Sequence, residues 1–417
     1  MSMLIIADDL SGAADCAIGF ARSGLHTVVA LDPGQGTDDA EVVAVDTDSR
    51  RMAASEAAQR TLAAFEVLSG PHQRLYKKID STLRGNWAAE VAALQPLAGL
   101  AIVAPAFPET GRTVLAGRVW VNGVALEDTD TWRLENAGRP ADLATLLAEA
   151  GLSAGHLGLD ELRGDPRAAV SSIVQARVQG AKALIVDAQN TDDLQALARL
   201  SAQLDFPVFW VGSGGLAREL CPVPGPTVAP ATDAAPAGGA LASTLVLVGS
   251  LSSVAERQCV ELKRRSGIVE LVVPPAVLRV GPQSREWADW AWRIGQYLTE
   301  GTDLLLRIGR DLYVDPSEGA QLSARLALLV KPHYAWLGGL VVTGGETARA
   351  MLGAVGIGGL RIIEELEAGT VLARPLDTTD HPGPRVVTKA GAFGSPQALY
   401  LAWRHLSGRA HTSIESR

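Results

Sequence analysis

Short and almost uninterrupted apolar runs recur along this 417-residue chain, and longer amphipathic segments lie between many of them. Such runs are typical of strands in parallel sheets that helices cover on both faces. They occur at 4–7, 27–31, 42–45, 75–79, 101–104, 183–186, 208–211, 245–248, 269–273, 304–308, 340–342 and 385–388. Helical patterns occur at 53–68, 191–204, 255–264 and 321–336. We therefore predict an α/β protein.

A segment rich in proline, alanine and glycine interrupts this alternation at 222–242. It has no apolar period of a strand or a helix, which is typical of an extended linker. A chain of 417 residues is also long for a single hydrophobic core. We therefore predict two domains, at 1–221 and 243–407, each a mostly parallel sheet flanked by helices.

The composition excludes several classes of function. A net charge of −9 and a pI near 5.4 argue against nucleic-acid and membrane-surface partners. The three cysteines lack metal-ligand spacing and fit a reducing cytoplasm. No apolar run reaches the ~20 residues that a transmembrane helix needs. We expect a cytoplasmic protein, and a homodimer is compatible with the sequence.

The first apolar run ends in two adjacent carboxylates, Asp8 and Asp9. In open α/β sheets, ligands bind beyond the carboxyl ends of the strands, where these residues fall. A pair of carboxylates there can bind Mg²⁺, orient a substrate hydroxyl or accept its proton. Asp9 or Ser11 can instead cap the following helix, but a single cap does not explain both aspartates.

Arginines follow two other strand ends. Arg50 is the candidate to bind a substrate carboxylate, because a guanidinium matches that group with two parallel hydrogen bonds. We interpret its neighbour Arg51 as a solvated arginine at a helix start. Arg112 lies in a loop shaped by two prolines and a glycine, and it either faces the pocket or is an ordinary loop residue.

The segment YKKIDSTLRGN is the most informative motif of the first half. Alternation along a strand places Lys78 and Asp80 on one face and Lys77 on the other. Asp80, Ser81 and Thr82 then supply a carboxylate and two hydroxyls at the strand end. A cation, a carboxylate and hydroxyl groups together suit a polyhydroxylated acid.

Glycine-rich turns follow three apolar runs of the second half and read GSLSS, TGGETA and KAGAFGS. Helix N-termini after such turns would gather backbone N–H groups at one edge, where they attract phosphate. One turn of this kind is a weak signal, but three in one domain favour a nucleotide site. Lys389 is a candidate to neutralise a phosphate, and Glu346 is a candidate to hold a ribose hydroxyl or a metal.

The standard phosphate-binding fingerprints G-x-x-x-x-G-K-[ST] and G-x-G-x-x-G are absent at the expected places. This disfavours a P-loop kinase and a dinucleotide-binding dehydrogenase of the usual kind. A nicotinamide-dependent hydroxy-acid oxidoreductase and a non-catalytic sugar-acid sensor stay as rival interpretations. Absorbance changes with NAD would reveal the oxidoreductase, and ligand binding without ADP release would reveal the sensor.

Taken in order, the motifs resemble the four-carbon acid sugar kinase family. The matching pieces are IADDLSGAAD, YKKIDSTLRGN, PAFPETGRT, VGS, TGGETA and KAGAFGS, which span nearly the whole chain. The resemblance implies an N-terminal acid-sugar domain and a C-terminal nucleotide domain. It also implies ATP-dependent phosphorylation of threonate, erythronate or 3-oxo-tetronate at the terminal hydroxyl, which yields a 4-phosphate.

The resemblance implies roles for individual residues. The acceptor positions, with Thr82 added from the same motif, are Asp9, Arg50, Lys78, Asp80, Ser81 and Thr82. The ATP positions are Ser250, Gly344, Gly345, Glu346, Thr347 and Gly391. Many members carry an HPxTPMxDS-like stretch where this chain reads LEDTDTWRL. This difference favours D-threonate or D-erythronate as the acceptor over the 3-oxo acid.

A mechanism follows from these assignments. We expect Arg50 and Lys78 to hold the carboxylate and hydroxyls of the acceptor. Asp9 or Asp80 is expected to orient the attacking hydroxyl or to take its proton. The glycine turns, Lys389 and Mg²⁺ would carry the phosphates of ATP, because phosphoryl transfer needs mostly positioning and charge neutralisation.

Overall fold

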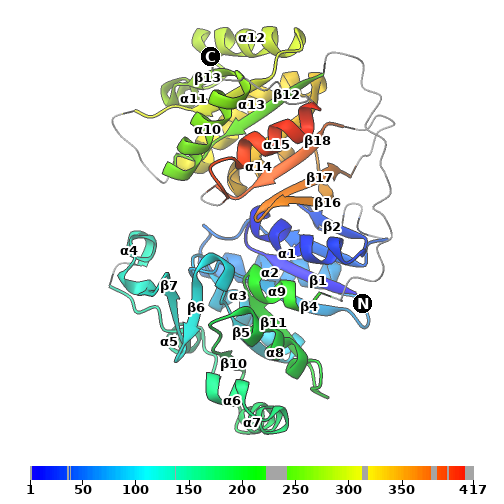
Figure 1. The fold of residues 1–417 in the computed structure, drawn as a ribbon, viewed down its shortest axis with the longest axis vertical. Coiled ribbons are helices and arrows are strands. Elements are labelled where there is room, and N and C mark those ends of the chain that lie inside the picture. The colour runs from blue at the N-terminus through cyan, green and yellow to red at the C-terminus, as the bar shows by residue number, and fades with distance from the viewer. Residues whose placement is uncertain are drawn as a thin grey trace, which may run out of the picture. The chain divides into compact units, whose positions relative to one another are not determined.

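The computed structural model describes residues 2–34, 37, 39–136, 138–221, 242–311, 318–376, 383–391 and 394–408. The chain divides into two compact units, Met1–Pro226 and Thr227–Arg417 (Figure 1). The linker predicted at 222–242 lies outside the described residues, apart from Ala242. Each unit is built around its own parallel strands and helices.

A parallel sheet forms the centre of the first unit, with strand order β2-β3-β1-β4-β11-β5-β10-β9 (Figure 1). The strands are β1 (Met3–Ala7), β2 (Thr27–Ala30), β3 (Val42–Asp46), β4 (Arg74–Lys78), β5 (Leu100–Ala104), β9 (Ala154–Leu157), β10 (Ala183–Val186) and β11 (Val208–Gly212). Every residue of β1, β3 and β5 is buried. Burial on both faces explains why these strands are continuous apolar runs rather than alternating ones.

Helices flank this sheet: α1 (Leu10–Arg22), α2 (Ala54–Leu68), α3 (Trp87–Ala98), α5 (Leu143–Glu149), α6 (Leu159–Arg163), α7 (Pro166–Val178), α8 (Thr191–Ser201) and α9 (Gly214–Glu219). An antiparallel sheet of β6 (Arg112–Leu115), β7 (Arg118–Val121) and β8 (Val124–Ala125) follows β5, and α4 (Asp130–Asn136) comes after it. Asp187 anchors the β6–β7 turn, because its carboxylate accepts hydrogen bonds of 2.8 and 3.0 Å from the N–H groups of Ala116 and Gly117.

The second unit has the strand order β13-β14-β12-β15-β18-β17-β16. Neighbours from β13 to β18 are parallel, whereas β17 is antiparallel to both β18 and β16. The strands are β12 (Ser243–Val248), β13 (Val269–Val273), β14 (Leu304–Ile308), β15 (Leu337–Thr343), β16 (Gly359–Glu367), β17 (Thr370–Pro375) and β18 (Arg385–Lys389). The helices are α10 (Ser253–Ser266), α11 (Pro275–Val280), α12 (Arg285–Thr299), α13 (Gly319–Val330), α14 (Gly345–Ala354) and α15 (Ala398–Ser407).

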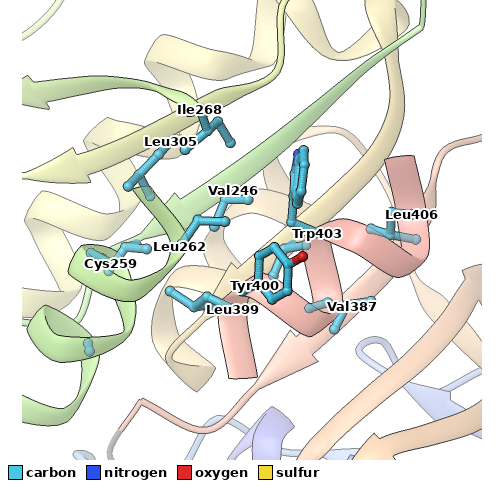
Figure 2. Close-up of a cluster of buried hydrophobic side chains, with 14 of the residues drawn as sticks. Val246, Cys259, Leu262, Ile268, Leu305, Val387, Leu399, Tyr400, Trp403 and Leu406 are labelled. Carbon is cyan, nitrogen blue, oxygen red and sulfur yellow. The ribbon is translucent and has the colours of Figure 1, made fainter. Parts of the chain in front are cut away.

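The core of the second unit includes a cluster between its sheet and two helices (Figure 2). Tyr400 and Trp403 of α15 pack with Leu262 of α10 and with the strand residues Val246 and Val387. The indole N–H of Trp403 donates a 2.9 Å hydrogen bond to the buried carboxylate of Asp303. That bond satisfies the one polar group of a large buried ring.

The predicted fold class is confirmed: both units are α/β, and most neighbouring strands are parallel. The pattern at 321–336 was predicted to be one helix, but α13 ends at Val330 and a 3₁₀ helix (Lys331–Trp336) follows it. Pro332 explains this change, because proline cannot donate the next helical hydrogen bond. No helix within the described ranges is long and apolar enough to cross a membrane.

Candidate active site

Side chains with opposite charges gather where β1, β3 and β4 end in the first unit. We call this group the charged edge; it consists of Asp8, Asp9, Arg50, Lys78, Asp80, Ser81, Thr82 and Arg84. β1 pairs with β3 on one side and with β4 on the other, so the three carboxyl ends are adjacent. The parallel sheet therefore brings together residues that are up to 76 positions apart in the chain, from Asp8 to Arg84.

Arg50 binds two carboxylates at once. Its Nε and Nη2 donate 2.8 Å hydrogen bonds to Asp8, and its Nη1 and Nη2 donate 2.9 Å hydrogen bonds to Asp9. Four of the five N–H groups of a guanidinium are thus engaged. Burial raises the pKa of Asp8, but the charge and hydrogen bonds of Arg50 outweigh this and hold the pKa below its ordinary value.

Asp9 has a second role as the N-cap of α1. One of its carboxylate oxygens accepts a 3.0 Å hydrogen bond from the backbone N–H of Gly12. The sequence offered a helix cap and a ligand-binding pair of carboxylates as alternatives, and the structure confirms the cap. The ligand-binding role of the pair stays a prediction. A Cβ atom at Gly12 would lie 2.5 Å from Asp9 Oδ1 and 2.7 Å from Lys78 Nζ. Asp9 and Lys78 therefore converge on a position that has no room for a side chain.

Lys78 is the last residue of β4, and only 6% of it is exposed. Burial lowers its pKa, but the acidic groups around it, Cys16, Asp9 and Asp8, outweigh this and raise the pKa. Its ammonium group is therefore charged at neutral pH. Within the part of the chain that the structure describes, no hydrogen bond from this ammonium group is found, so its three donors can bind an anion.

Asp80 organises the turn that follows β4. Arg84 donates hydrogen bonds of 3.0 and 2.9 Å to its two oxygens, and Thr82 donates from its backbone N–H at 3.1 Å and from its hydroxyl. Burial raises the pKa of Asp80, but Arg84 above all, followed by Arg50 and Thr82, holds that pKa well below the ordinary value. Asp80 is therefore an ionised carboxylate and a weak base. Ser81 is buried in the same turn.

Arg112 opens β6 and lies close enough to Asp80 and Arg84 for their charges to affect its pKa. Burial lowers that pKa, and the carboxylate of Asp80 partly opposes the effect. The Nη1 of Arg112 donates a hydrogen bond to the carbonyl of Thr110 in its own loop, so this arginine shapes the loop and also feels the charge of Asp80. Arg84 had no assigned role in the sequence, although its spacing of four residues from Asp80 was a usable signal.

The second unit has a different edge, where β12, β15 and β18 end. We call it the glycine rim; it consists of residues 249–252, 343–347 and 389–391. β15 lies between β12 and β18, so the three turns are adjacent. A Cβ atom at Gly391 would lie 2.9 Å from Ser250 Oγ and 3.6 Å from the Cα of Gly344. The three glycine-rich turns thus meet at one place, and glycine permits that close approach.

The helices at this rim begin differently. α10 has a side-chain cap, since Ser252 accepts a 3.1 Å hydrogen bond from the N–H of Ala255 and donates one of 3.1 Å to the carbonyl of Gly391. α14 follows Gly344, which has a φ of 97° and provides no side-chain cap. Because Gly344 has no side chain, the N-cap residue cannot accept a hydrogen bond from the first N–H groups of α14. An uncapped helix N-terminus is suited to an anion.

Two further residues of the rim face the protein interior. Thr347 is buried, and its hydroxyl lies 3.1 Å from that of Ser323. A Cβ atom at Gly249 would lie 2.0 Å from Thr347 Oγ1, so these turns are in close contact. The buried hydroxyl of Thr343 has no hydrogen-bond partner in the described structure, and the sequence did not single it out.

Lys389 is the last residue of β18 and is 1% exposed. Its ammonium group donates a 2.7 Å hydrogen bond to the carbonyl of Ala390. Burial lowers the pKa of Lys389 to about 8, although the carboxylate of Glu367 opposes the shift. This lysine therefore titrates close to neutral pH, unlike Lys78.

Two family models match the chain. One is described as a sugar-binding N-terminal domain and matches residues 3–220, and the other is described as a nucleotide-binding C-terminal domain and matches residues 245–399. A D-threonate kinase from Cupriavidus necator is 53% identical over 411 residues, which are 98% of each chain. A D-threonate kinase from Bordetella bronchiseptica is 32% identical, again over 98% of each chain.

A solved structure from Salmonella typhimurium LT2 has the same fold. It superposes with a TM-score of 0.78 at 22% sequence identity and covers 97% of this chain and 99% of its own. The fold, the two matched models and the full-length relatives agree with one another. The chain belongs to the four-carbon acid sugar kinase family, whose models pair a sugar-binding domain with a nucleotide-binding domain.

Proposed function

We propose that this protein is an ATP-dependent kinase that phosphorylates the terminal hydroxyl of D-threonate and releases the 4-phosphate. The observation that carries the proposal is the 53% identity to the D-threonate kinase of Cupriavidus necator along 98% of both chains. The aligned residues extend through both domains. We further propose that residues 1–221 bind the sugar acid and residues 243–407 bind ATP, with 222–242 as the linker.

The charged edge supports a small acid as the acceptor. The ammonium group of Lys78 is buried, charged and beside Asp9, so it can attract a carboxylate while Asp9 accepts a hydrogen bond from a hydroxyl. Most of the N–H groups of the Arg50 guanidinium already donate to Asp8 and Asp9. We therefore propose that Arg50 first orients these carboxylates and offers its remaining N–H to the acceptor.

Asp80 is proposed to position the acceptor rather than to act as a strong base. Its pKa lies well below the ordinary value, because Arg84 and Thr82 stabilise its charged form. A strong base is not needed when the transition state is loose and the attacking hydroxyl keeps its proton until late. Asp9, Ser81 and Thr82 complete the set of groups that would contact acceptor hydroxyls.

The glycine rim supports ATP as the donor. We propose that the β- and γ-phosphates bind at the uncapped N-terminus of α14, where Gly345 and Thr347 provide backbone N–H groups. The N–H of Gly344 donates a 2.8 Å hydrogen bond to the carbonyl of Lys389, so Gly344 contributes close backbone approach instead. Ser250 and Gly391 form the facing wall of the same site. A helix N-terminus carries roughly half a positive charge, which favours phosphate.

If Mg²⁺ binds at the glycine rim, most of its ligands would come from the nucleotide phosphates and few from the protein. Among the described residues, no group of three or more His, Cys, Asp or Glu side chains is placed to hold a metal. Mg²⁺ in kinases is typically bound by phosphates, water and one or two carboxylates. We propose Glu346, in the first turn of α14, as the carboxylate that holds it. The ion would neutralise charge on the transferring phosphate.

The cellular location and the oligomeric state of the protein are also proposals. Cys16, Cys221 and Cys259 are free thiols, which supports the cytoplasm as its location. A homodimer stays a prediction, and sedimentation velocity on the purified chain would test it.

A coupled ADP-release assay tests the function directly. We expect turnover with D-threonate to exceed turnover with D-erythronate and 3-oxo-tetronate, and ³¹P NMR should place the phosphate on the terminal carbon. Absence of acid-dependent ADP release with all three acids would overturn the kinase proposal. A better rate with D-erythronate or the 3-oxo acid would keep the kinase and replace the acceptor.

A further inference from the structure

Next to the charged edge, the first unit buries an ion pair that has no role in the mechanism above. Lys77 of β4 and Glu90 of α3 are both 0% exposed, and their Nζ and Oε2 atoms lie 3.0 Å apart. Lys77 also lies 3.3 Å from the carbonyl oxygen of Ile6, to which it donates. Neighbouring residues on a strand point to opposite faces, so this pair lies on the face opposite to Lys78.

Glu90 is connected to the segment that carries Arg50. The hydroxyl of Ser49 donates to Oε1 of Glu90, and Ser49 is 0% exposed. The hydroxyl of Thr47 lies 2.8 Å from that of Ser49 and donates a 2.9 Å hydrogen bond to the carbonyl of Ala7. Ala7 directly precedes Asp8, so a continuous set of contacts links the ion pair to both partners of the Arg50–Asp8 pair.

The backbone around Arg50 is held from a second direction. Asn86 donates from its Nδ2 to the carbonyls of Ser49, at 3.3 Å, and Met52, at 2.8 Å. Asp48 has a φ of 50°, in the left-handed region that few residues other than glycine adopt. A segment with this conformation needs surrounding contacts to keep it in place.

A buried ion pair is poor evidence for stability, because the lost hydration of the two ions offsets their attraction. Well-packed apolar residues of similar size often stabilise a protein as much. Apolar side chains cannot, however, accept the hydrogen bond of Ser49. This is the one contribution of Glu90 that an apolar core would lack.

We propose that Glu90 is a positioning residue for the acceptor site. Its carboxylate holds Ser49, and through Ser49 it directs the guanidinium of Arg50, while the ammonium group of Lys77 pairs with the other carboxylate oxygen of Glu90. The inference rests on the proposed function, because it assigns this network to the binding of the acid acceptor.

Three variants test this network through the KM of the acceptor. Ser49→Ala and the apolar double variant K77M/E90L both remove the hydrogen bond, and each should raise the KM for D-threonate about tenfold. Their KM for ATP should stay unchanged. The double variant K77M/E90Q keeps an oxygen that can accept from Ser49 without a buried charge, so its KM should return close to the wild-type value.

A control ion pair joins two helices of the same unit, α6 and α8. Arg163 binds the buried carboxylate of Asp193 with hydrogen bonds of 2.8 and 2.9 Å. Asp193 lies in α8, which follows β10. Two strands, β11 and β5, separate β10 from β4, the strand of Lys77. The variant R163M/D193L should lower the melting temperature and leave the KM for D-threonate unchanged. Equal KM values for K77M/E90L and the wild type would overturn the inference, as would a raised KM in the control.

A measurement without substrate separates this inference from the proposed function. Amide hydrogen exchange at 47–52 should be faster in K77M/E90L than in the wild type, and K77M/E90Q should restore slow exchange. If the wild type releases no ADP with D-threonate, the kinase proposal fails while the exchange result still decides whether Glu90 holds this segment. Equal exchange in all three proteins would show that Glu90 has no such role.

Discussion

The charged edge of the first unit and the glycine rim of the second both lie where parallel strands end, but they are built from different groups. At the charged edge, Arg50 joins Asp8 and Asp9, and Arg84 joins Asp80, so side chains supply nearly all the polarity. At the glycine rim, glycine backbones meet closely, and α14 begins without a side-chain cap. Lys389, the cation of this rim, is buried against a carbonyl.

This difference corresponds to what each proposed ligand requires. A small acid with several hydroxyl groups has to be recognised by its stereochemistry, which needs directional side chains held in place by their own ion pairs. A triphosphate presents many equivalent oxygens, and backbone N–H groups at a helix N-terminus can bind them without fixing a single geometry. Under the proposed function, side-chain charge would serve selectivity in the first unit, while close backbone approach would serve affinity in the second.

The largest expected effect comes from Asp80→Ala. Removing this carboxylate leaves Arg84 and Thr82 without their shared partner, so the turn after β4 should lose its arrangement. We expect kcat/KM for D-threonate to fall about a thousandfold, while the Kd for ATP by calorimetry stays within twofold. Asp187→Ala is the control, since Asp187 is also a buried aspartate at a strand end and should affect stability only. Preserved turnover in Asp80→Ala would remove this residue from the acceptor site.

The next effect belongs to the glycine rim. In Gly249→Ala, the new methyl group would lie 2.0 Å from Thr347 Oγ1 and 3.0 Å from its Cβ, so the turn has to move. We expect the Kd for ATP to increase about thirtyfold without a change in acceptor binding. Gly353→Ala provides the control within α14, because nothing lies within 4 Å of its added Cβ. Unaltered ATP binding in Gly249→Ala would mean that this turn is not part of the nucleotide site.

A matching substitution probes the charged edge. Gly12→Ala would push its methyl group against Asp9 Oδ1 and Lys78 Nζ, which are both ends of side chains that can shift. The loss of folding stability should be moderate, but acceptor binding should weaken. We expect a KM for D-threonate about tenfold higher and an unchanged KM for ATP. Gly70→Ala, whose added Cβ would lie 3.9 Å from Oε1 of Gln73, should leave both constants as they are. A change in the KM for ATP alone would contradict the division between the two edges.

The smallest effect is a pH dependence that distinguishes the two lysines. The pKa of Lys389 is lowered by burial to about 8, so its positive charge is present below that pH and is lost above it. We expect the KM for ATP to rise about threefold between pH 7 and pH 9. The KM for D-threonate should stay level over the same range, because the pKa of Lys78 is raised and its charge persists.

The variant Lys389→Met checks the source of this dependence. It should bind ATP more weakly at pH 7 and show no further change up to pH 9. A wild-type KM for ATP that is level across this range would mean that the charge of Lys389 does not reach the phosphates. A KM for D-threonate that rises in parallel would instead point to a common effect on the whole protein.

Local patterns in the sequence were sufficient for much of the fold. β1, β3 and β5 are buried throughout, and their apolar runs were found because burial on both faces leaves no polar position. β16 and β17 were missed. They form an antiparallel pair with bulges, and many residues of β16 are only half buried, so neither strand has a clear apolar run.

The sequence by itself determined which residues stand at the strand ends, including Asp9, Lys78 and Asp80, because a short strand followed by a polar turn is a local signal. Only the tertiary structure decided what those residues contact. Arg50 was expected to face a ligand, and in the structure it binds Asp8 and Asp9. Glu90 was not singled out in the sequence, and it is buried against Lys77 and Ser49. Such contacts depend on how distant segments pack in the sheet, and no local pattern contains that information.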